Sequence, residues 1–206
     1  MIPVAPADEP DDFETEVRQP GVKFLGTVEV GKKPKFKGKE FWRRSLLDLH
    51  KAYGGICSYT CHFIPFDTGA DTVEHFRPKD LYPAQAYEWS NFRLVCARLN
   101  ARKGIHEDVL DPFTIGDGTF VLDFPSLQIL PADGLEPSVQ ARAESTINRL
   151  KLNDERTIKS RLRYVLDLRN GMINFAVVER DAPFIASEIA RQNIGGQLGQ
   201  IMAEVL

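Results

Sequence analysis

The pattern of apolar positions first predicts a helix, two short strands and a second helix. Residues 40–53 carry apolar side chains at intervals of three and four, and a Gly-Gly pair at 54–55 marks the end of this helix. Residues 73–76 and 92–95 lack that period and fit short strands on either side of a loop that contains proline. A further helix is expected to begin near Cys96.

The pattern then predicts a hairpin followed by a mainly helical region. Gly116-Asp117-Gly118 lies between the apolar segments 109–113 and 119–124, an arrangement that favours two strands joined by this turn. Beyond it, apolar residues recur as stripes at helical spacing, and Gly171 marks the end of a helix. A last helix is expected over 182–206, interrupted by two glycines. The pattern therefore predicts an α+β fold.

Length and composition favour one ordinary globular domain with an appended subdomain. The chain has 206 residues, of which 43% are hydrophobic and 27% are charged. No apolar run is long enough to span a membrane, and no signal-peptide pattern is present, so we expect a cytoplasmic protein. Three cysteines do not form a disulfide framework, and an odd number leaves at least one free thiol, as suits a reducing compartment.

Charge is segregated near the N-terminus, although the formal net charge is only −3. Residues 1–19 carry six acidic side chains against one arginine, together with three prolines, which is typical of a mobile arm. Residues 32–44 reverse the sign, with seven basic side chains and one acid. This cluster is either a phosphate-binding surface or a solvated basic face. From it we select Lys33, Lys35 and Lys37 as candidate nucleic-acid contacts.

The segment from Cys57 to Gly104 carries three ordered pieces. A Glu-His pair followed by Arg-Pro is, by itself, usually a surface turn. The pieces are Glu74-His75 with Pro78-Lys79, then Trp89-Ser90-Asn91, then Cys96 with Asn100-Ala101-Arg102-Lys103-Gly104. In this order and spacing they resemble the HNH endonuclease family. The resemblance implies a ββα-metal unit, in which the acid and the histidine lie on a strand, the middle asparagine shapes the connection and the last asparagine lies on the following helix.

We accordingly expect three parts: an acidic then basic N-terminal arm (1–39), an HNH core with its preceding helix and following hairpin (40–126), and a mainly helical C-terminal region (127–206). Weaker similarity continues beyond the core, through 110–113 and 146–153. The longer pattern resembles the small HNH nuclease subunits of bacterial anti-phage systems such as Septu, which work beside an ATPase partner.

The chemistry of phosphodiester hydrolysis explains these residue types. Hydrolysis needs an activated water and a cation that stabilises charge on the phosphate and the leaving oxygen. We expect His75 to act as the general base, since its ordinary pKa of roughly 6.5 suits proton transfer at neutral pH. Glu74 and Asn100 are expected to hold Mg²⁺ or Mn²⁺, which prefer oxygen ligands. Asn91 completes the catalytic set as a residue that organises the loop by hydrogen bonding.

A structural zinc is not expected. Many HNH proteins brace the motif with zinc held by two CxxC pairs, which supply four thiolates. Here Cys57, Cys61 and Cys96 are present, but Leu99 stands where a fourth thiolate would lie. His62 is a substitute ligand in principle, yet it follows Cys61 directly. We therefore expect the three cysteines to pack with Leu99 as a small apolar cluster.

The predicted function is a metal-dependent endonuclease that acts on nucleic acid, with DNA as the expected substrate. Lys79, Arg102 and Lys103 are expected to contact phosphates. Two alternatives stay open. One is a catalytically silent nucleic-acid-binding module, and the other is a structural subunit of an ATPase complex whose C-terminal helices dock onto the partner. Metal-dependent cleavage by the purified chain distinguishes the first function from both alternatives.

Overall fold

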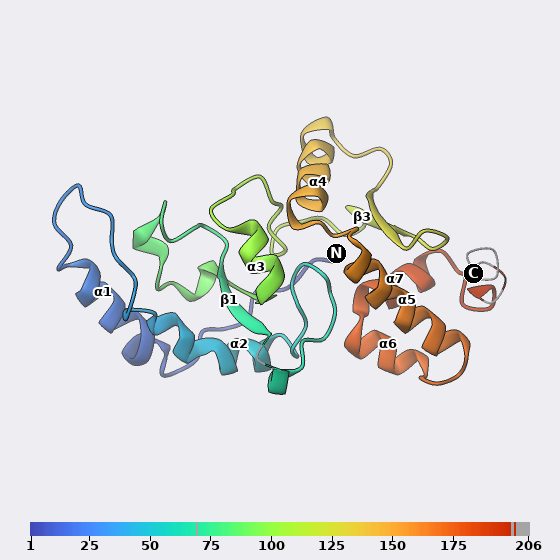
Figure 1. Ribbon diagram of the computed structural model, residues 1–206, viewed down its shortest axis with the longest axis horizontal. Coiled ribbons are helices and arrows are strands. Elements are labelled where there is room, and N and C mark those ends of the chain that lie inside the picture. Colours follow the sequence, from blue (N-terminus) through green and yellow to red (C-terminus); the bar gives the residue numbers. More distant parts are fainter. Residues whose placement is uncertain (69, 199, 201–206) are drawn as a thin grey trace. The chain divides into compact units, whose positions relative to one another are not determined.

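A computed structural model describes residues 1–68, 70–198 and 200 of the chain (Figure 1). The described residues form seven α-helices, several shorter helical turns and two antiparallel sheets of two strands each. The predicted α+β class is thereby confirmed. Two compact units make up the chain. The first, called the core unit, comprises Ala5–Cys57 and Ile64–Glu107; the second, called the C-terminal unit, comprises Met1–Val4, Ser58–Phe63 and the chain from Asp108 onward.

The core unit carries the predicted strand, strand and helix succession. Its elements are the π-helical turn η1 (Glu14–Arg18), α1 (Gln19–Leu25), the 3₁₀ turn η2 (Phe41–Ser45), α2 (Leu46–Ala52), β1 (Asp71–His75), β2 (Phe92–Cys96) and α3 (Ala97–Lys103), with short 3₁₀ turns η3 (Phe66–Thr68), η4 (Pro83–Gln85) and η5 (Trp89–Asn91). The helix expected over 40–53 is confirmed as η2 followed by α2. Gly54 and Gly55 end it with φ angles of 57° and 70°, which glycine adopts at little steric cost.

Strands β1 and β2 form an antiparallel ladder that runs directly into α3. The register places Glu74 opposite Arg93 and His75 opposite Phe92. Because successive side chains of a strand point to opposite faces, Glu74 and His75 project from different sides of β1. Cys96 precedes the first helical residue in extended conformation, so β2 and α3 follow one another without a loop. The unit therefore has the ββα order that the resemblance implies.

The N-terminal segment is folded, and the expectation of a mobile arm was wrong. Phe13 and Val17, four residues apart, are each only 1% exposed. The Phe13 ring meets Trp89 and Phe92 edge-on, with centroids 5.6 and 5.8 Å apart. Arg18 forms ion pairs with three surrounding glutamates. Although this segment is rich in acidic residues, one face of its helical turn is apolar. That face is buried because aromatic side chains of the core unit pack against it.

The C-terminal unit joins a hairpin to four helices. Its elements are β3 (Phe120–Asp123), β4 (Gln128–Pro131), α4 (Pro137–Leu150), α5 (Glu155–Arg169), α6 (Phe175–Asp181) and α7 (Pro183–Arg191). The strand predicted over 119–124 exists, but its partner is β4 and not 109–113. Pro112 interrupts the earlier segment, whereas Leu127 with φ of 54° completes a tight turn after Asp123. The hairpin belongs to this unit, so the two units divide the chain differently from the three predicted parts.

The predicted helical stripes account for the packing of the C-terminal unit. Ile147 and Leu150 of α4 and Val165 of α5 are buried. Asp154 begins α5 by accepting a hydrogen bond from the backbone of Thr157. The last predicted helix begins as expected at α7, but its part at 199 and 201–206 lies outside the described residues. No helix in the described part of the chain is long and apolar enough to cross a membrane.

Candidate functional site

A pocket of about 420 Å³ in the core unit gathers several of the predicted site residues. Strand β1 forms one wall, and η2 with the start of α2 forms another. Helix α3 and the loop after β1 complete it. The residues that line the pocket are Trp42, Arg43, Leu46, Asp71, Thr72, Val73, His75, Lys79 and Asn100. The structure therefore brings His75, Asn100 and Lys79 together, whereas Glu74 does not line this pocket.

His75 lies at the end of β1 with its ring packed between aromatic side chains. The ring meets Trp42 and Phe92 edge-on, at centroid distances of 4.8 and 5.2 Å. Its Nε2 lies 2.9 Å from the carbonyl oxygen of Ala86. A carbonyl only accepts, so Nε2 must carry the proton, and Nδ1 is the basic nitrogen of the neutral ring. Burial lowers the pKa of His75 to about 4, which keeps the ring neutral at pH 7.

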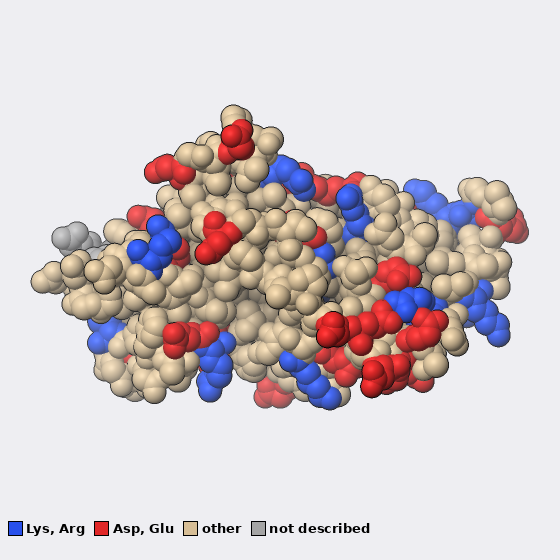
Figure 2. Space-filling view, turned by 180° about the vertical axis from the view of Figure 1, so that it is seen from behind, with Lys and Arg blue, Asp and Glu red and all other residues tan. Residues whose placement is uncertain are grey.

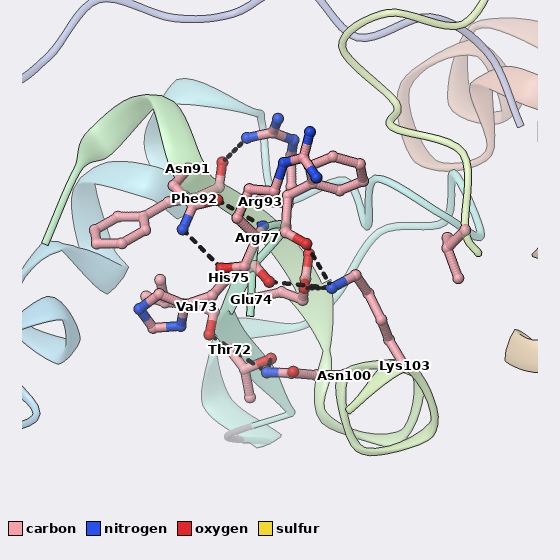
Figure 3. A network of polar contacts seen from close by, with 12 residues as sticks. Thr72, Val73, Glu74, His75, Arg77, Asn91, Phe92, Arg93, Asn100 and Lys103 are labelled. Carbon is pink, nitrogen blue, oxygen red and sulfur yellow. Dashed lines mark hydrogen bonds and ion pairs between the residues drawn. The ribbon is translucent and has the colours of Figure 1, made fainter. Parts of the chain in front are cut away.

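Glu74 projects to the other side of β1, where it pairs with Lys103 of α3 (Figure 3). The Lys103 Nζ lies 2.6 Å from Glu74 Oε1, and both side chains are 1% exposed. The same ammonium donates hydrogen bonds to the backbone carbonyls of His75 and Phe76, at 3.0 and 2.9 Å. Glu74 therefore stands in a buried ion pair that ties α3 to the end of β1.

Asn91 closes the loop between β1 and β2 through both ends of its amide (Figure 3). Its Oδ1 accepts a hydrogen bond from the backbone N–H of Arg77 at 2.7 Å. Its Nδ2 donates to the carbonyls of Arg77 and Gln85, each at 3.0 Å. Asn91 is 4% exposed and touches the backbone on both sides of the loop. The side chain thus has the loop-organising position for which it was selected.

Asn100 on α3 faces β1 and is oriented by two hydrogen bonds. Its Nδ2 donates to Thr72 Oγ1 at 3.0 Å and to the carbonyl of Val73 at 3.3 Å. The Thr72 hydroxyl in turn donates to the carbonyl of Val95 at 2.6 Å. Because the nitrogen must face the Val73 carbonyl, the amide oxygen of Asn100 is the atom left to ligate a cation.

The basic residues selected from the sequence lie in different surroundings. Lys79 lines the pocket, with its Nζ 5.7 and 5.8 Å from the ring centroids of Phe36 and Trp42. Arg102 is half-buried on α3. Lys103 is fully buried, so the expectation that it contacts a phosphate was wrong for the folded chain. Lys103 faces Glu74 from α3, and its ammonium group is paired with the Glu74 carboxylate.

Lys33, Lys35 and Lys37 are exposed in the segment between α1 and η2. On the face of the molecule that Figure 2 draws, basic and acidic side chains are interspersed. The three lysine side chains form no ion pair with any described residue, so they are available for phosphate contacts, which release counterions from a nucleic acid. These three lysines therefore remain candidates for binding that does not depend on base sequence.

Replacing these three lysines with alanine is expected to weaken binding to unrelated DNA sequences by similar factors and to flatten the dependence of affinity on salt. Fluorescence anisotropy at several salt concentrations measures both. An unchanged salt slope would instead place the run on a solvated face or at a protein interface. The matched control removes the same charge from exposed positions elsewhere, namely Lys51, Lys151 and Lys159.

The cysteines divide between the two units. Cys57 and Cys96 lie together in the core unit, where the neighbouring Cys57 thiol and burial raise the pKa of Cys96 well above its usual range. Leu99 is fully buried there. Cys61 belongs to the C-terminal unit. Among the described residues, no group of three or more histidine, cysteine or acidic side chains is placed to hold a metal. Whether the purified chain carries zinc stays a prediction.

Sequence reasoning missed Asp71, the first residue of β1, which lines the pocket with His75. The signal was present in the strand period. Asp71, Val73 and His75 alternate along β1, so they share one face, whereas Glu74 lies on the opposite face. Applied to 71–75, that period separates the two members of the Glu-His pair before any tertiary contact is considered.

Comparison with known proteins supports part of the resemblance drawn from the motifs. No protein-family model matches the chain. The chain is 28% identical over 116 residues to "Septu protein PtuB" of Bacillus thuringiensis. The similar stretch covers 56% of this chain and 42% of that protein. The chain is thus distantly similar to a Septu protein over less than half of that protein's length.

Proposed function

We propose that this chain is a metal-dependent endonuclease of the HNH type that hydrolyses phosphodiester bonds in nucleic acid, with DNA as the expected substrate. The observation that carries the proposal is that His75 and Asn100 line one pocket. His75 lies on β1 and Asn100 lies on α3, the first and last elements of the ββα succession. The distant similarity to a Septu protein supports a role in an anti-phage system of the Septu type. For this role we also propose an ATPase partner, as the motif resemblance implies.

In this function His75 takes a proton from the attacking water. The Ala86 carbonyl orients the ring through Nε2, so Nδ1 is the proton acceptor. Burial lowers the pKa of His75 to about 4, so at pH 7 the ring is unprotonated and can accept a proton, although it is a weaker base than a free imidazole. Lys79 and Arg43 line the same pocket and place positive charge near a phosphate. Asn91 holds the loop that carries Ala86, whose carbonyl orients His75, through its hydrogen bond to the carbonyl of Gln85.

The donor atoms in the pocket fit a hard divalent cation such as Mg²⁺ or Mn²⁺. Asn100 presents an amide oxygen, and the pocket wall includes a buried carboxylate. When bound, such a cation stabilises the charge that develops on the phosphate and the leaving oxygen. Glu74 does not fit this role while Lys103 Nζ lies 2.6 Å from its carboxylate.

Metal-dependent cleavage by the purified full-length chain tests the proposal. Supercoiled plasmid, linear duplex, single-stranded DNA and RNA are incubated with Mg²⁺, Mn²⁺ or EDTA. We expect cleavage only with a divalent cation, and less than one equivalent of zinc by elemental analysis. Cleavage that persists in EDTA contradicts the proposal. Stoichiometric zinc that resists dialysis, with unfolding on chelation, contradicts the assignment of the cysteines.

One observation favours a second function. The Glu74–Lys103 pair removes from the pocket the carboxylate that the HNH pattern uses. A chain that has lost its cation site would serve as a silent nucleic-acid-binding or structural subunit of an ATPase complex. Retention of DNA without cleavage under every metal condition supports that alternative.

A further inference from the structure

We infer that Asp71, and not Glu74, supplies the carboxylate of a divalent-cation site in this pocket, together with the amide oxygen of Asn100. The inference deepens the proposed function and rests on it for the use of the cation. It does not rest on the family pattern, which points to Glu74. It follows from which side chains of β1 face the pocket and from which of them already have partners.

Asp71 is a buried carboxylate with an unsatisfied oxygen. The side chain lines the pocket and its residue is only 6% exposed. Its Oδ2 is buried and receives no hydrogen bond from any described residue. A buried polar oxygen without a hydrogen-bond partner is costly, so native proteins rarely leave one without an ion, a water or a functional role. A cation bound from solution supplies the missing partner.

The two basic side chains that line the same pocket, Lys79 and Arg43, do not pair with Asp71. Lys79 Nζ lies over the rings of Phe36 and Trp42 and 3.7 Å from Asp80 Oδ2. Arg43 is exposed. No ion pair of Asp71 occurs among those resolved in the described chain. The Asp71 carboxylate is therefore not neutralised by a neighbouring ammonium, as that of Glu74 is.

Asn100, the proposed second oxygen ligand, lines the same pocket as Asp71. Asn100 is hydrogen bonded to Thr72 and Val73, the two residues that follow Asp71. One carboxylate and one amide oxygen leave most positions around Mg²⁺ or Mn²⁺ to water and to a substrate phosphate, as is usual for Mg²⁺ sites that act on phosphates. His75 projects from the same face of β1 as Asp71, so the basic nitrogen and the proposed site share the pocket.

Cation binding to the purified full-length chain tests this inference without an activity assay. Free Mn²⁺ is followed by electron paramagnetic resonance, and Mg²⁺ is titrated against the melting temperature. We expect Asp71→Asn to weaken Mn²⁺ binding at least about tenfold, since loss of an outer-sphere group alone costs that much. Asp71→Asn should also melt no lower than the parent chain without metal, because it replaces a carboxylate oxygen that has no hydrogen-bond partner among the described residues.

The matched control is Asp80→Asn, which neutralises a half-exposed carboxylate next to the pocket and should leave Mn²⁺ binding unchanged. Glu74→Gln should also retain Mn²⁺ binding, with folding verified by circular dichroism. Loss of binding in Glu74→Gln together with normal binding in Asp71→Asn overturns the inference. Unchanged binding in both variants, or no binding by the parent chain, overturns it as well. Asp71→Ser serves as a second variant if Asp71→Asn does not fold.

The experiments distinguish a failure of the proposed cation site from a failure of the proposed nuclease function. Mn²⁺ binding that depends on Asp71, with no cleavage of any nucleic acid, supports the cation site and contradicts the proposed nuclease. Cleavage that survives in Asp71→Asn at unchanged Mn²⁺ concentration supports the nuclease and contradicts the assignment of Asp71.

Discussion

The His75→Ala variant is expected to cleave more slowly by a factor on the order of 10² to 10⁴, the usual contribution of a general base. The variant loses the nitrogen that takes the proton from water, but the residues proposed to hold the cation and the phosphate remain. Single-turnover cleavage of labelled DNA with saturating protein measures the chemical step, and anisotropy measures DNA affinity, which we expect to change little.

The His75 ring is packed against Trp42 and Phe92, so its removal also lowers stability. The assay is therefore run well below the melting temperature of the variant. Added imidazole provides the control, because it restores a proton acceptor without restoring the packing. Partial recovery with imidazole supports the role of His75, whereas near-normal turnover without it would reject the assignment.

Lys103→Met is expected to lower the free energy of unfolding by about 3 to 5 kcal/mol, the usual cost of removing one partner from a buried ion pair. The remaining Glu74 carboxylate is 1% exposed and cannot recover its hydration. The carbonyls of His75 and Phe76 lose their donor at the same time. Urea denaturation followed by tryptophan fluorescence measures the change, because both tryptophans, Trp42 and Trp89, lie in the core unit.

The double variant Glu74→Gln/Lys103→Met should be more stable than Lys103→Met alone, because it also removes the buried carboxylate that has lost its Lys103 partner. The matched control is Lys159→Met, which breaks an ion pair with Glu155 whose side chains are 69% and 79% exposed. Such solvent-exposed pairs contribute little to stability, because water and salt screen them. Equal destabilisation by Lys103→Met and Lys159→Met would show that Glu74 and Lys103 do not form a buried pair in solution.

The two adjacent residues Glu74 and His75 lie on opposite faces of β1 and have different surroundings. Glu74 joins α3 to β1, while the pocket on the other face of β1 carries His75 and Asp71. The same helix contributes to both, because Lys103 pairs with Glu74 while Asn100, about one turn earlier on α3, lines the pocket. A change at α3 is therefore expected to alter stability and cation binding together.

Local pattern determined the elements that carry the site. The helix over 40–53, the two strands and the start of α3 after Cys96 were all predicted, because apolar period, glycine stops and strand length act over a few neighbouring residues. The motif spacing likewise brought His75, Asn91 and Asn100 to attention as one set. Such features depend on the residues nearby in the chain and are therefore visible in the amino-acid sequence.

Tertiary structure decided the features that depend on distant partners. Phe13 and Val17 are buried because Trp89 and Phe92 cover them, and β3 pairs with β4 because the turn at Leu127 allows it. Composition predicted that the first segment is a mobile arm, and the HNH motif predicted that Lys103 contacts a phosphate. The rest of the fold covers one face of each helix or strand. Which face is covered decides whether a charged side chain contacts solvent, pairs with an opposite charge or lines a pocket. For Glu74 and Asp71, three residues apart on one strand, that difference in surroundings separates an ion pair from a candidate cation ligand.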